Sequence, residues 1–257
     1  MVDDDELGHG ARSLGGNRAT GCPASDRRAR PGWQSCARRP VRARLKICCI
    51  GDADELRRAV AAGADAVGLV GPMPSGPGPI PLELAAELAR LCPPAVTSVL
   101  LSSARSAEGL AREVETVRPA ALQIVDRVGE PVRRALRQAF PWLRLVQVVH
   151  VEGPGAVEEA RAAAPTADAL LLDSGRPGAA VPELGGTGRT HDWAVARAIV
   201  EAVARPVFLA GGLTPETIGR AIRTVRPFGV DVCSGVRRAG RLDPERLAAM
   251  AAAVAAA

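Results

Sequence analysis

The stretch PVFLAGGLTPE covers residues 206–216, and the stretch GVDVCSGV follows at residues 229–236. Each begins with a short apolar run typical of a buried strand and ends in a turn of small residues. In the first stretch Thr214 is a good N-cap, and Pro215 suits the first position of a helix. Such turns after two successive late strands are where a (β/α)8 barrel builds a phosphate site. The two stretches therefore predict a parallel barrel whose last two strand ends bind an anion.

The same alternation extends back through the chain. Six further apolar runs precede these two, at 45–50, 66–70, 96–101, 121–125, 143–150 and 168–173. Amphipathic segments predict helices, among them 54–63, 81–91, 106–117, 130–140 and 214–225. Eight strand-then-helix units in one domain indicate an α/β protein with a closed (β/α)8 TIM barrel. An open doubly wound sheet is the alternative, because a sequence pattern counts strands without showing that they close.

Composition fits an aliphatic core and assigns the basic charge to one end of the chain. Hydrophobic residues make up 47% of the 257 residues and aromatic residues 2%, so small aliphatic side chains must fill the core. The net charge is +5, but residues 1–44 hold nine Lys/Arg against five Asp/Glu, which leaves +1 for residues 45–257. Because the basic charge belongs to the N-terminal segment, we expect no nucleic-acid partner.

Residues 1–44 show no periodicity and are rich in Gly, Arg, Ser and Pro. We expect a disordered basic N-terminal extension there, followed by a catalytic barrel domain at 45–257. A basic docking arm is the alternative. No apolar run approaches the roughly 20 residues of a membrane span, and the N-terminus lacks the apolar stretch of a signal peptide. We therefore expect a cytoplasmic protein with no membrane partner.

Six cysteines are scattered through the chain, at positions 22, 36, 48, 49, 92 and 233. None is part of a CxxC pair, so zinc-finger spacing is absent and no metal site is predicted. We expect reduced thiols, which are usual in a cytosolic protein. Cys48 and Cys49 would point to opposite faces of a strand and are poor disulfide partners. Redox control through this vicinal pair is an alternative that only the pair itself supports.

The candidates for anion binding lie in the last two turns. They are Gly211, Gly212, Ser234 and Gly235. Paired glycines let the backbone approach an anion closely, and the helix that follows offers free N–H groups. Tight turns without a ligand are the alternative. The helix lacks a full capping box, because its third position holds Thr217 rather than Glu or Gln.

Two side chains at other strand ends are candidates for moving protons. Cys48 lies near the end of the first strand, where a thiolate near a phosphate site could act as a base. A small core residue is the alternative reading of Cys48. Asp173 directly follows Leu170–Leu172, where a carboxylate is costly to bury unless it lies at the open rim. It is a candidate acid, and an N-cap or a salt bridge is its alternative role.

The segment from Ser174 to Asp192 is long for a barrel loop and contains GGTG at 185–188. Such length is typical of a lid or a binding loop. GGTG is not followed by the GK[ST] of a P-loop, so we reject a nucleoside triphosphatase.

Six blocks of the sequence resemble the phosphoribosylanthranilate isomerase family, the Amadori isomerases of tryptophan biosynthesis. The blocks are KIC (46–48), AGADAVGLV (62–70), LLLDS (170–174), GGTGRTHDW (185–193), PVFLAGGLTPE (206–216) and RPFGVDVCSGV (226–236). They occur in order over about residues 45–250, and the last three are specific to this family. The resemblance implies a TIM barrel of the ribulose-phosphate-binding type that acts on a small phosphorylated sugar.

In this family a carboxylic acid protonates the ribose ring oxygen, and the ring opens to a protonated Schiff base. A thiolate then removes the proton from C2′, and the enolamine becomes an aminoketone. Carried over by motif, the resemblance implies that Cys48 is the general base and Asp173 the general acid. It also implies that the four residues of the last two turns bind phosphate, and that neither a metal nor a cofactor is needed.

Three departures from the family pattern stand out. The family usually reads KICG, and here Cys49 replaces the Gly. Residues 73–80 read MPSGPGPI and lack the Arg that pairs with the anthranilate carboxylate in the family. Residues 123–126 read QIVD in place of QLHG. The phosphate half thus resembles the family more closely than the half that holds the aglycone.

Either another cation takes over the carboxylate, or the substrate differs. Arg237 and Arg189 are the candidate cations, although each could be an ordinary surface Arg, and Gly186 is a further tentative binding residue. Our hypothesis is that Arg237 extends the anion site.

The resemblance therefore implies an isomerase of N-(5-phosphoribosyl)anthranilate that forms carboxyphenylamino-deoxyribulose phosphate. Two alternatives stay open. One is an isomerase of a related phosphorylated sugar conjugate with a different aglycone, and the other is a non-catalytic barrel that binds phosphorylated metabolites. Family members occur as monomers and dimers, so we expect a monomer or a homodimer.

Overall fold

A computed structural model describes residues 42–74, 76, 78–175 and 192–257 of the chain. Most of the expected N-terminal extension lies outside these residues, as do Gly186 and Arg189. The barrel begins slightly earlier than the expected boundary at residue 45. Ala43 is buried, and Arg44 already pairs with β8 as the first residue of β1.

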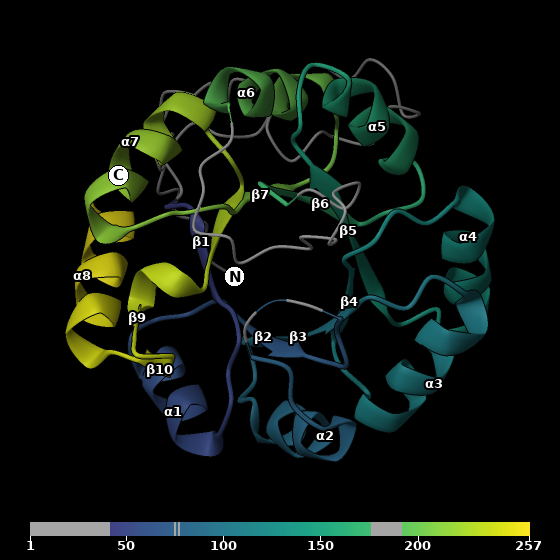
Figure 1. Ribbon diagram of the computed structural model, residues 1–257, viewed down its shortest axis with the longest axis horizontal. Helices are drawn as coiled ribbons and strands as arrows, with labels where there is room; N and C mark the ends of the chain where they lie inside the picture. The colour runs from purple at the N-terminus through teal and green to yellow at the C-terminus, as the bar shows by residue number, and fades with distance from the viewer. Residues whose placement is uncertain (1–41, 75, 77, 176–191) are drawn as a thin grey trace, which may run out of the picture. The chain divides into compact units, whose positions relative to one another are not determined.

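The eight expected strands form a closed parallel barrel in chain order (Figure 1). The strands are β1 (Arg44–Ile47), β2 (Ala66–Val70), β3 (Thr97–Ser102), β4 (Ala121–Ile124), β5 (Arg144–His150), β6 (Ala169–Asp173), β7 (Val207–Leu209) and β8 (Gly229–Val232). Closure comes from the pairing of β1 with β8, in which Arg44 lies opposite Gly229 and Ile47 opposite Val232. This confirms the barrel and excludes the open sheet.

A ring of helices surrounds the strands (Figure 1). The helices are α1 (Ala53–Ala61), α2 (Leu82–Leu91), α3 (Ala107–Val117), α4 (Glu130–Ala139), α5 (Ala156–Ala163), α6 (Trp193–Ala202), α7 (Pro215–Val225) and α8 (Pro244–Ala255). Their starts follow capping rules: Asp52 accepts from the N–H groups of Asp54 and Glu55, and Ser106 accepts from that of Gly109. These bonds satisfy donors that the first helical turn leaves without a partner.

Residues along each strand alternate between two apolar layers. On β3, Leu100 packs in the main core between strands and helices, whereas Val99 and Leu101 belong to a smaller cluster inside the barrel. On β6, Leu170 and Leu172 likewise face the helices. A parallel sheet covered on both faces needs this nearly continuous apolar sequence. The low aromatic content is therefore met by many aliphatic contacts.

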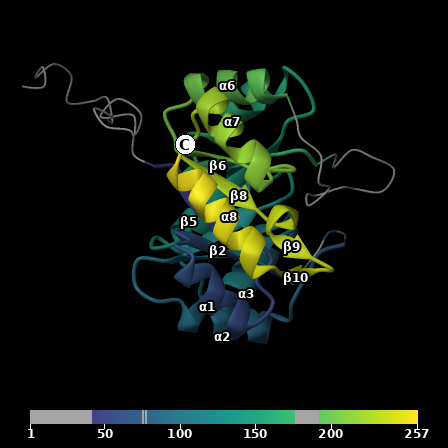
Figure 2. The ribbon, with the colours of Figure 1, turned by 90° about the vertical axis from the view of Figure 1, so that its left-hand side faces the viewer.

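The chain leaves β8 through a short excursion before its last helix. A 3-10 turn, η1 (Ser234–Val236), leads into β9 (Arg237–Arg238) and β10 (Arg241–Leu242), which pair antiparallel. Figure 2 shows this hairpin beside α8. It brings the segment after β8 over the first turn of α1, where Leu242 N–H donates to Glu55 Oε1 at 2.9 Å.

Candidate active site

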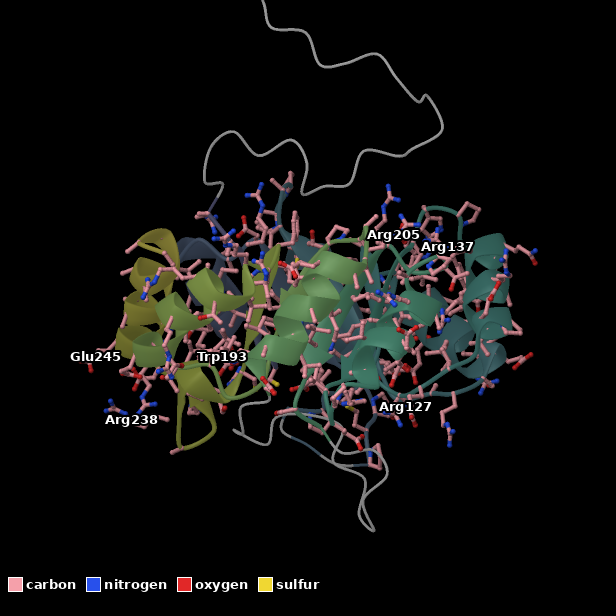
Figure 3. All side chains as sticks on the ribbon, turned by 90° about the horizontal axis from the view of Figure 1, so that it is seen from above. Arg127, Arg137, Trp193, Arg205, Arg238 and Glu245 are labelled. Atoms are coloured by element: carbon pink, nitrogen blue, oxygen red, sulfur yellow. The ribbon has the colours of Figure 1, made fainter. Side chains whose placement is uncertain are left out.

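The eight strands of the barrel are parallel, so their carboxyl ends all lie on one side of it. Figure 3 shows Arg127, which follows β4, and Arg238, which follows β8, at one end of the barrel. Arg205, which precedes β7, lies at the opposite end. In this fold, sites are built from the loops that follow the strands. Residues at the carboxyl ends of the strands are therefore the ones to examine.

The two glycine turns after β7 and β8 are in direct contact. Gly211 and Gly212 adopt φ angles of 86° and 60°, which side chains with a Cβ rarely allow. A Cβ on Gly235 would lie 2.0 Å from the carbonyl oxygen of Leu213. Ser234, beside that contact, is exposed. The structure thus brings the four predicted anion-binding residues to one place.

Helix α7 begins directly after the first of these turns and corrects one expectation. The Thr214 N–H donates to Thr217 Oγ1 at 3.0 Å, so a hydroxyl plays the part that the sequence rule reserves for Glu or Gln. The reach-back half of a capping box is therefore present. The first N–H groups of α7 add to the positive end of its dipole.

Cys48 lies just beyond β1, inside the barrel mouth. Its N–H donates to the carbonyl oxygen of Val232 at 2.8 Å, which extends the β1–β8 pairing by one residue. Its side chain is buried, and its Sγ occupies the space above Gly68, where a Cβ would lie 2.7 Å from the sulfur. Gly68 in β2 is thus needed for the thiol to lie where it does.

Asp173 is the last residue of β6 and lies partly buried at the rim. Its Oδ1 accepts from the Ser174 N–H at 2.7 Å. Burial raises the pKa of Asp173, and the Asp231 carboxylate acts in the same direction, while His150 and Lys46 oppose the shift. A raised pKa favours the protonated form, which is the form that a general acid requires.

A buried ion pair joins β1 to β8 inside the barrel, and sequence reasoning missed its role. Lys46 Nζ lies 2.9 Å from Asp231 Oδ1, and both side chains are less than a tenth exposed. Burial alone would lower the pKa of Lys46, but the Asp231 carboxylate, together with the Cys48 and Cys49 sulfurs, outweighs it and the pKa is raised. Both residues lie in blocks that carry the family resemblance, and a charged residue at an inward-facing strand position was the available signal.

His150 is a second residue that sequence reasoning passed over. It ends β5 opposite Asp173 in register and is almost fully buried. Its Nε2 lies 3.0 Å from the carbonyl oxygen of Val125, an acceptor, so Nε2 carries the proton. Its Nδ1 has no partner among the described residues. The only available signal was a polar residue at the end of an apolar run.

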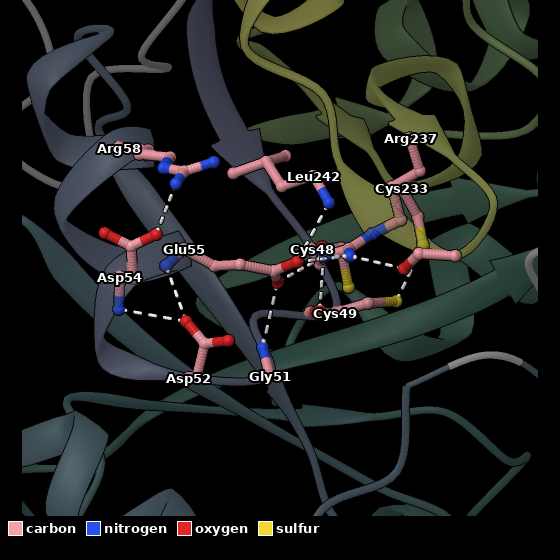
Figure 4. Close-up of polar contacts among 11 residues, drawn as sticks. Cys48, Cys49, Gly51, Asp52, Asp54, Glu55, Arg58, Cys233, Arg237 and Leu242 are labelled. Atoms are coloured by element: carbon pink, nitrogen blue, oxygen red, sulfur yellow. Dashed lines mark hydrogen bonds and ion pairs between the residues drawn. The ribbon is translucent and has the colours of Figure 1, made fainter.

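Arg237 does not have the position that the hypothesis required. Its guanidinium donates to both carboxylate oxygens of Glu55 at 3.0 Å (Figure 4). It also donates to the carbonyl oxygens of Cys48, Cys49 and Gly240. Both Nη atoms are therefore occupied by acceptors within the protein. Arg237 ties the segment after β8 to the β1–α1 loop, which argues against an extension of the anion site.

The loops that depart from the family pattern in sequence contact their neighbours around the mouth of the barrel. Gly78, in the loop after β2, has φ of 82°, and a Cβ there would lie 2.7 Å from the Cβ of Cys49. Asp126 Oδ2, after β4, is 3.4 Å from Nε of Arg105, which lies in the loop after β3. Ser103 Oγ donates to the carbonyl oxygen of Pro72 at 3.1 Å and joins the loops after β2 and β3.

Two further findings concern only the described residues. They contain no group of three or more His, Cys, Asp and Glu side chains arranged to hold a metal ion. Nor does any helix among them have the length and apolarity needed to cross a membrane.

Comparison with known proteins points in one direction. The family model for N-(5′-phosphoribosyl)anthranilate isomerase matches residues 45–253. The N-(5′-phosphoribosyl)anthranilate isomerase of Haloferax volcanii is 42% identical over 201 residues, which cover 77% of this chain and 86% of that protein.

Solved structures agree. Phosphoribosylanthranilate isomerase from Thermus thermophilus superposes with a TM-score of 0.70 at 30% identity, covering 83% of this chain and 98% of that one. A phosphoribosylanthranilate isomerase in complex with reduced 1-(o-carboxyphenylamino)-1-deoxyribulose 5-phosphate gives a TM-score of 0.68 at 27% identity, covering 84% and 100%. The chain therefore belongs to the phosphoribosylanthranilate isomerase family.

Proposed function

We propose that this protein isomerises N-(5′-phosphoribosyl)anthranilate, or a close analogue, to the corresponding 1-amino-1-deoxyribulose phosphate in tryptophan biosynthesis. The observation that carries the proposal is the shared environment of Cys48 and Asp173. Cys48 directly follows β1 and Asp173 ends β6, so a thiol and a carboxyl whose pKa burial raises both lie at the carboxyl ends of the strands, at one mouth of the barrel. An aldose–ketose isomerisation needs one proton donor and one acceptor in such an arrangement.

The phosphate would bind at the two contacting glycine turns. The left-handed backbone of Gly211 and Gly212 and the start of α7 offer N–H groups on one side. The exposed Ser234 and the neighbouring Gly235 offer donors on the other. Binding energy from this remote phosphate would position the ribose for the reaction.

The chemistry then divides between the two groups. Asp173 gives its proton to the ribose ring oxygen, the bond from that oxygen to C1′ breaks, and the nitrogen lone pair completes a protonated Schiff base. Cys48, as thiolate, takes the proton from C2′ and leaves an enolamine, which tautomerises to the aminoketone. The buried Lys46 stabilises negative charge that appears in this region.

The aglycone is the open half of the proposal. The loop after β2 carries no Arg, Arg237 is engaged by Glu55, and Arg189 lies outside the described residues. A substrate with a different aglycone is therefore the second candidate function.

We further propose that the protein works in the cytoplasm, which the absence of a membrane-spanning helix among the described residues supports.

Kinetics of Cys48→Ala and Asp173→Asn test the acid/base assignment. Removing a general acid or base lowers turnover about 100- to 10,000-fold. Cys92→Ser is the matched control, since Cys92 is the C-cap residue of α2 and lies just before β3, at the end of the barrel opposite the carboxyl ends of the strands. Full turnover in both site variants would refute the mechanism and favour a non-catalytic binding barrel.

Complementation of a tryptophan auxotroph that lacks this isomerase tests the substrate. Growth with the wild-type gene, and its loss with Asp173→Asn, would identify anthranilate as the aglycone. A protein that binds inorganic phosphate but does not support growth would direct the search to other phosphorylated sugar conjugates.

A further inference from the structure

A second sulfur contact lies beside the proposed base. The Sγ atoms of Cys233, which directly follows β8, and of Cys49, after β1, share a hydrogen bond of 2.7 Å (Figure 4). The two residues are 184 positions apart in sequence, and both are thiols in the structure. Their sulfur atoms are only about 0.7 Å farther apart than the roughly 2.0 Å of a disulfide bond. Closing the barrel is what brings them together.

The backbone at Cys49 is strained for a residue that has a Cβ. Cys49 has φ of 63°, a left-handed value that residues with a Cβ rarely adopt. Other described non-glycine residues with positive φ include Arg118 and Arg226, which are C-caps of helices and have an ordinary reason for it. Observed strain of this kind at a strand end points to a function for the side chain.

The neighbouring loop makes room for this side chain. Gly78 has no Cβ, and one built there would lie 2.7 Å from the Cβ of Cys49. The family pattern has glycine at the position of Cys49, which would need no such space. A strained cysteine and the glycine that accommodates it thus occur together in this chain.

The two thiols differ in the way that a reacting pair needs. Hydrogen bonding with Cys49 lowers the pKa of Cys233, and the Arg237 guanidinium acts in the same direction against the effect of burial. Hydrogen bonding with Cys233 and with Cys48 raises the pKa of Cys49, as does burial. Cys233 is partly exposed, whereas Cys49 is buried. A redox-active pair has this form: an accessible thiolate beside a second, resolving thiol.

We propose that Cys49 and Cys233 are a site of reversible oxidative modification, at which a disulfide closes between the end of β1 and the end of β8. The oxidant is a hydroperoxide. The Cys233 thiolate attacks its terminal oxygen, the O–O bond breaks, and the alcohol or water leaves, so that Cys233 becomes a sulfenic acid. The Cys49 sulfur then attacks the sulfenic sulfur, the S–S bond forms, the S–O bond breaks, and hydroxide leaves with the Cys49 proton as water. Two thiols lose two electrons in all, and the hydroperoxide gains them.

The disulfide would act on the residues on either side of it. Cys49 follows Cys48, the proposed base, and Cys233 precedes Ser234 of the second glycine turn. Drawing the two sulfurs together shifts both segments by a fraction of an ångström, and errors of about 1 Å in a site lower turnover about 100-fold. We expect oxidation to lower kcat at least tenfold. This effect on turnover, unlike the bond itself, rests on the proposed function.

Mass spectrometry of the full-length protein tests the bond without any assay of activity. The protein is treated with equimolar hydrogen peroxide, alkylated and digested with trypsin. The expected product joins the peptide 47–57 to the peptide 224–237, with the loss of two hydrogen atoms. The cross-link should persist in Cys48→Ser and Cys92→Ser and disappear in Cys49→Gly and Cys233→Ser. Burial raises the pKa of Cys92 to about 11, so this thiol should resist peroxide and be found alkylated once the protein is denatured for alkylation.

Activity is then followed in the wild type and in Cys49→Gly, which restores the residue that the family pattern has. Peroxide should lower kcat of the wild type at least tenfold, dithiothreitol should restore it, and Cys49→Gly should keep its turnover throughout. A cross-link through Cys48, or sulfinic acid on Cys233 without a cross-link, would overturn the proposal. If the wild type has no turnover before peroxide treatment but still forms the expected cross-link after it, the proposed function is refuted and the modification site stands.

Discussion

Replacing Gly235 with Ala tests whether contact between the two glycine turns creates the phosphate site. The added Cβ would lie 2.0 Å from the carbonyl oxygen of Leu213 and 3.1 Å from its carbonyl carbon. Real Cβ atoms essentially never come within 3.0 Å of such atoms, so the two turns must separate by about 1 Å. Because both Leu213 atoms belong to the backbone, no rotation of a side chain relieves the contact.

The consequence can be expressed as a rate. A displacement of about 1 Å in a binding site lowers turnover about 100-fold. That factor corresponds to about 2.7 kcal/mol of transition-state stabilisation. Overpacking of this kind also lowers the free energy of unfolding by about 1–3 kcal/mol. We therefore expect Gly235→Ala to fold and to lose about 100-fold in kcat/KM.

Two measurements check this expectation. Steady-state kinetics give kcat/KM, and thermal unfolding with and without inorganic phosphate reports binding, because a ligand of the folded state raises Tm. Phosphate should raise the Tm of the wild type and have little effect on Gly235→Ala. Gly153→Ala is the control, since a Cβ at Gly153 meets no atom within 4 Å. The reasoning would be refuted if Gly235→Ala kept the kcat/KM of the wild type and phosphate raised its Tm as much as it raises that of the wild type.

Further predictions concern the interior, the loop after β2 and the proposed acid. Lys46→Met should lower the free energy of unfolding by about 3–5 kcal/mol, because it leaves the buried Asp231 carboxylate without its cation; the double variant with Asp231→Leu should recover most of that loss in denaturant titrations. Gly78→Ala should lower the free energy of unfolding by at least about 1–2 kcal/mol, because Gly78 has positive φ. The added Cβ would also clash with the Cβ of Cys49, and this part of the loss should vanish in a Cys49→Gly background, so strictly additive effects of the two substitutions would contradict the contact. Asp173 has a raised pKa, so its contribution to stability is complete below the unfolded pKa and is lost as pH rises through the folded pKa. Turnover should also fall on that alkaline side, and the difference in stability between wild type and Asp173→Asn should change with pH over the same interval; a constant difference would contradict the shift.

Local pattern was enough to locate the secondary structure. Each strand of the barrel begins and ends within three residues of the apolar run that predicts it, because a parallel strand buried on both faces must be apolar throughout. The predicted turn after the seventh strand is also present, and its two glycines, Gly211 and Gly212, adopt positive φ. The capping of α7 was harder to predict, because the Thr217 hydroxyl takes the place of the Glu or Gln side chain that the capping-box rule expects.

Individual side-chain roles at the mouth were harder to predict. Arg237 follows a phosphate turn in sequence, but in the structure it donates to Glu55, which is 182 residues away. His150 and the Lys46–Asp231 pair lie inside the barrel only because their strands present those positions inward. Their chemistry depends on neighbours from other strands, and no local pattern encodes such neighbours.

By itself, then, the sequence determined the barrel, the two glycine turns, Cys48 and Asp173 as the groups to test, and a family membership that comparison confirmed. The tertiary structure alone decided which cysteine faces Cys49. The sequence predicts only that the adjacent Cys48 is a poor disulfide partner for Cys49. Closure of the barrel lays the end of β8 beside the end of β1 and brings the Cys233 and Cys49 sulfur atoms within 2.7 Å of each other. Short-range sterics and burial fix the elements, and long-range strand pairing fixes which of their side chains can react.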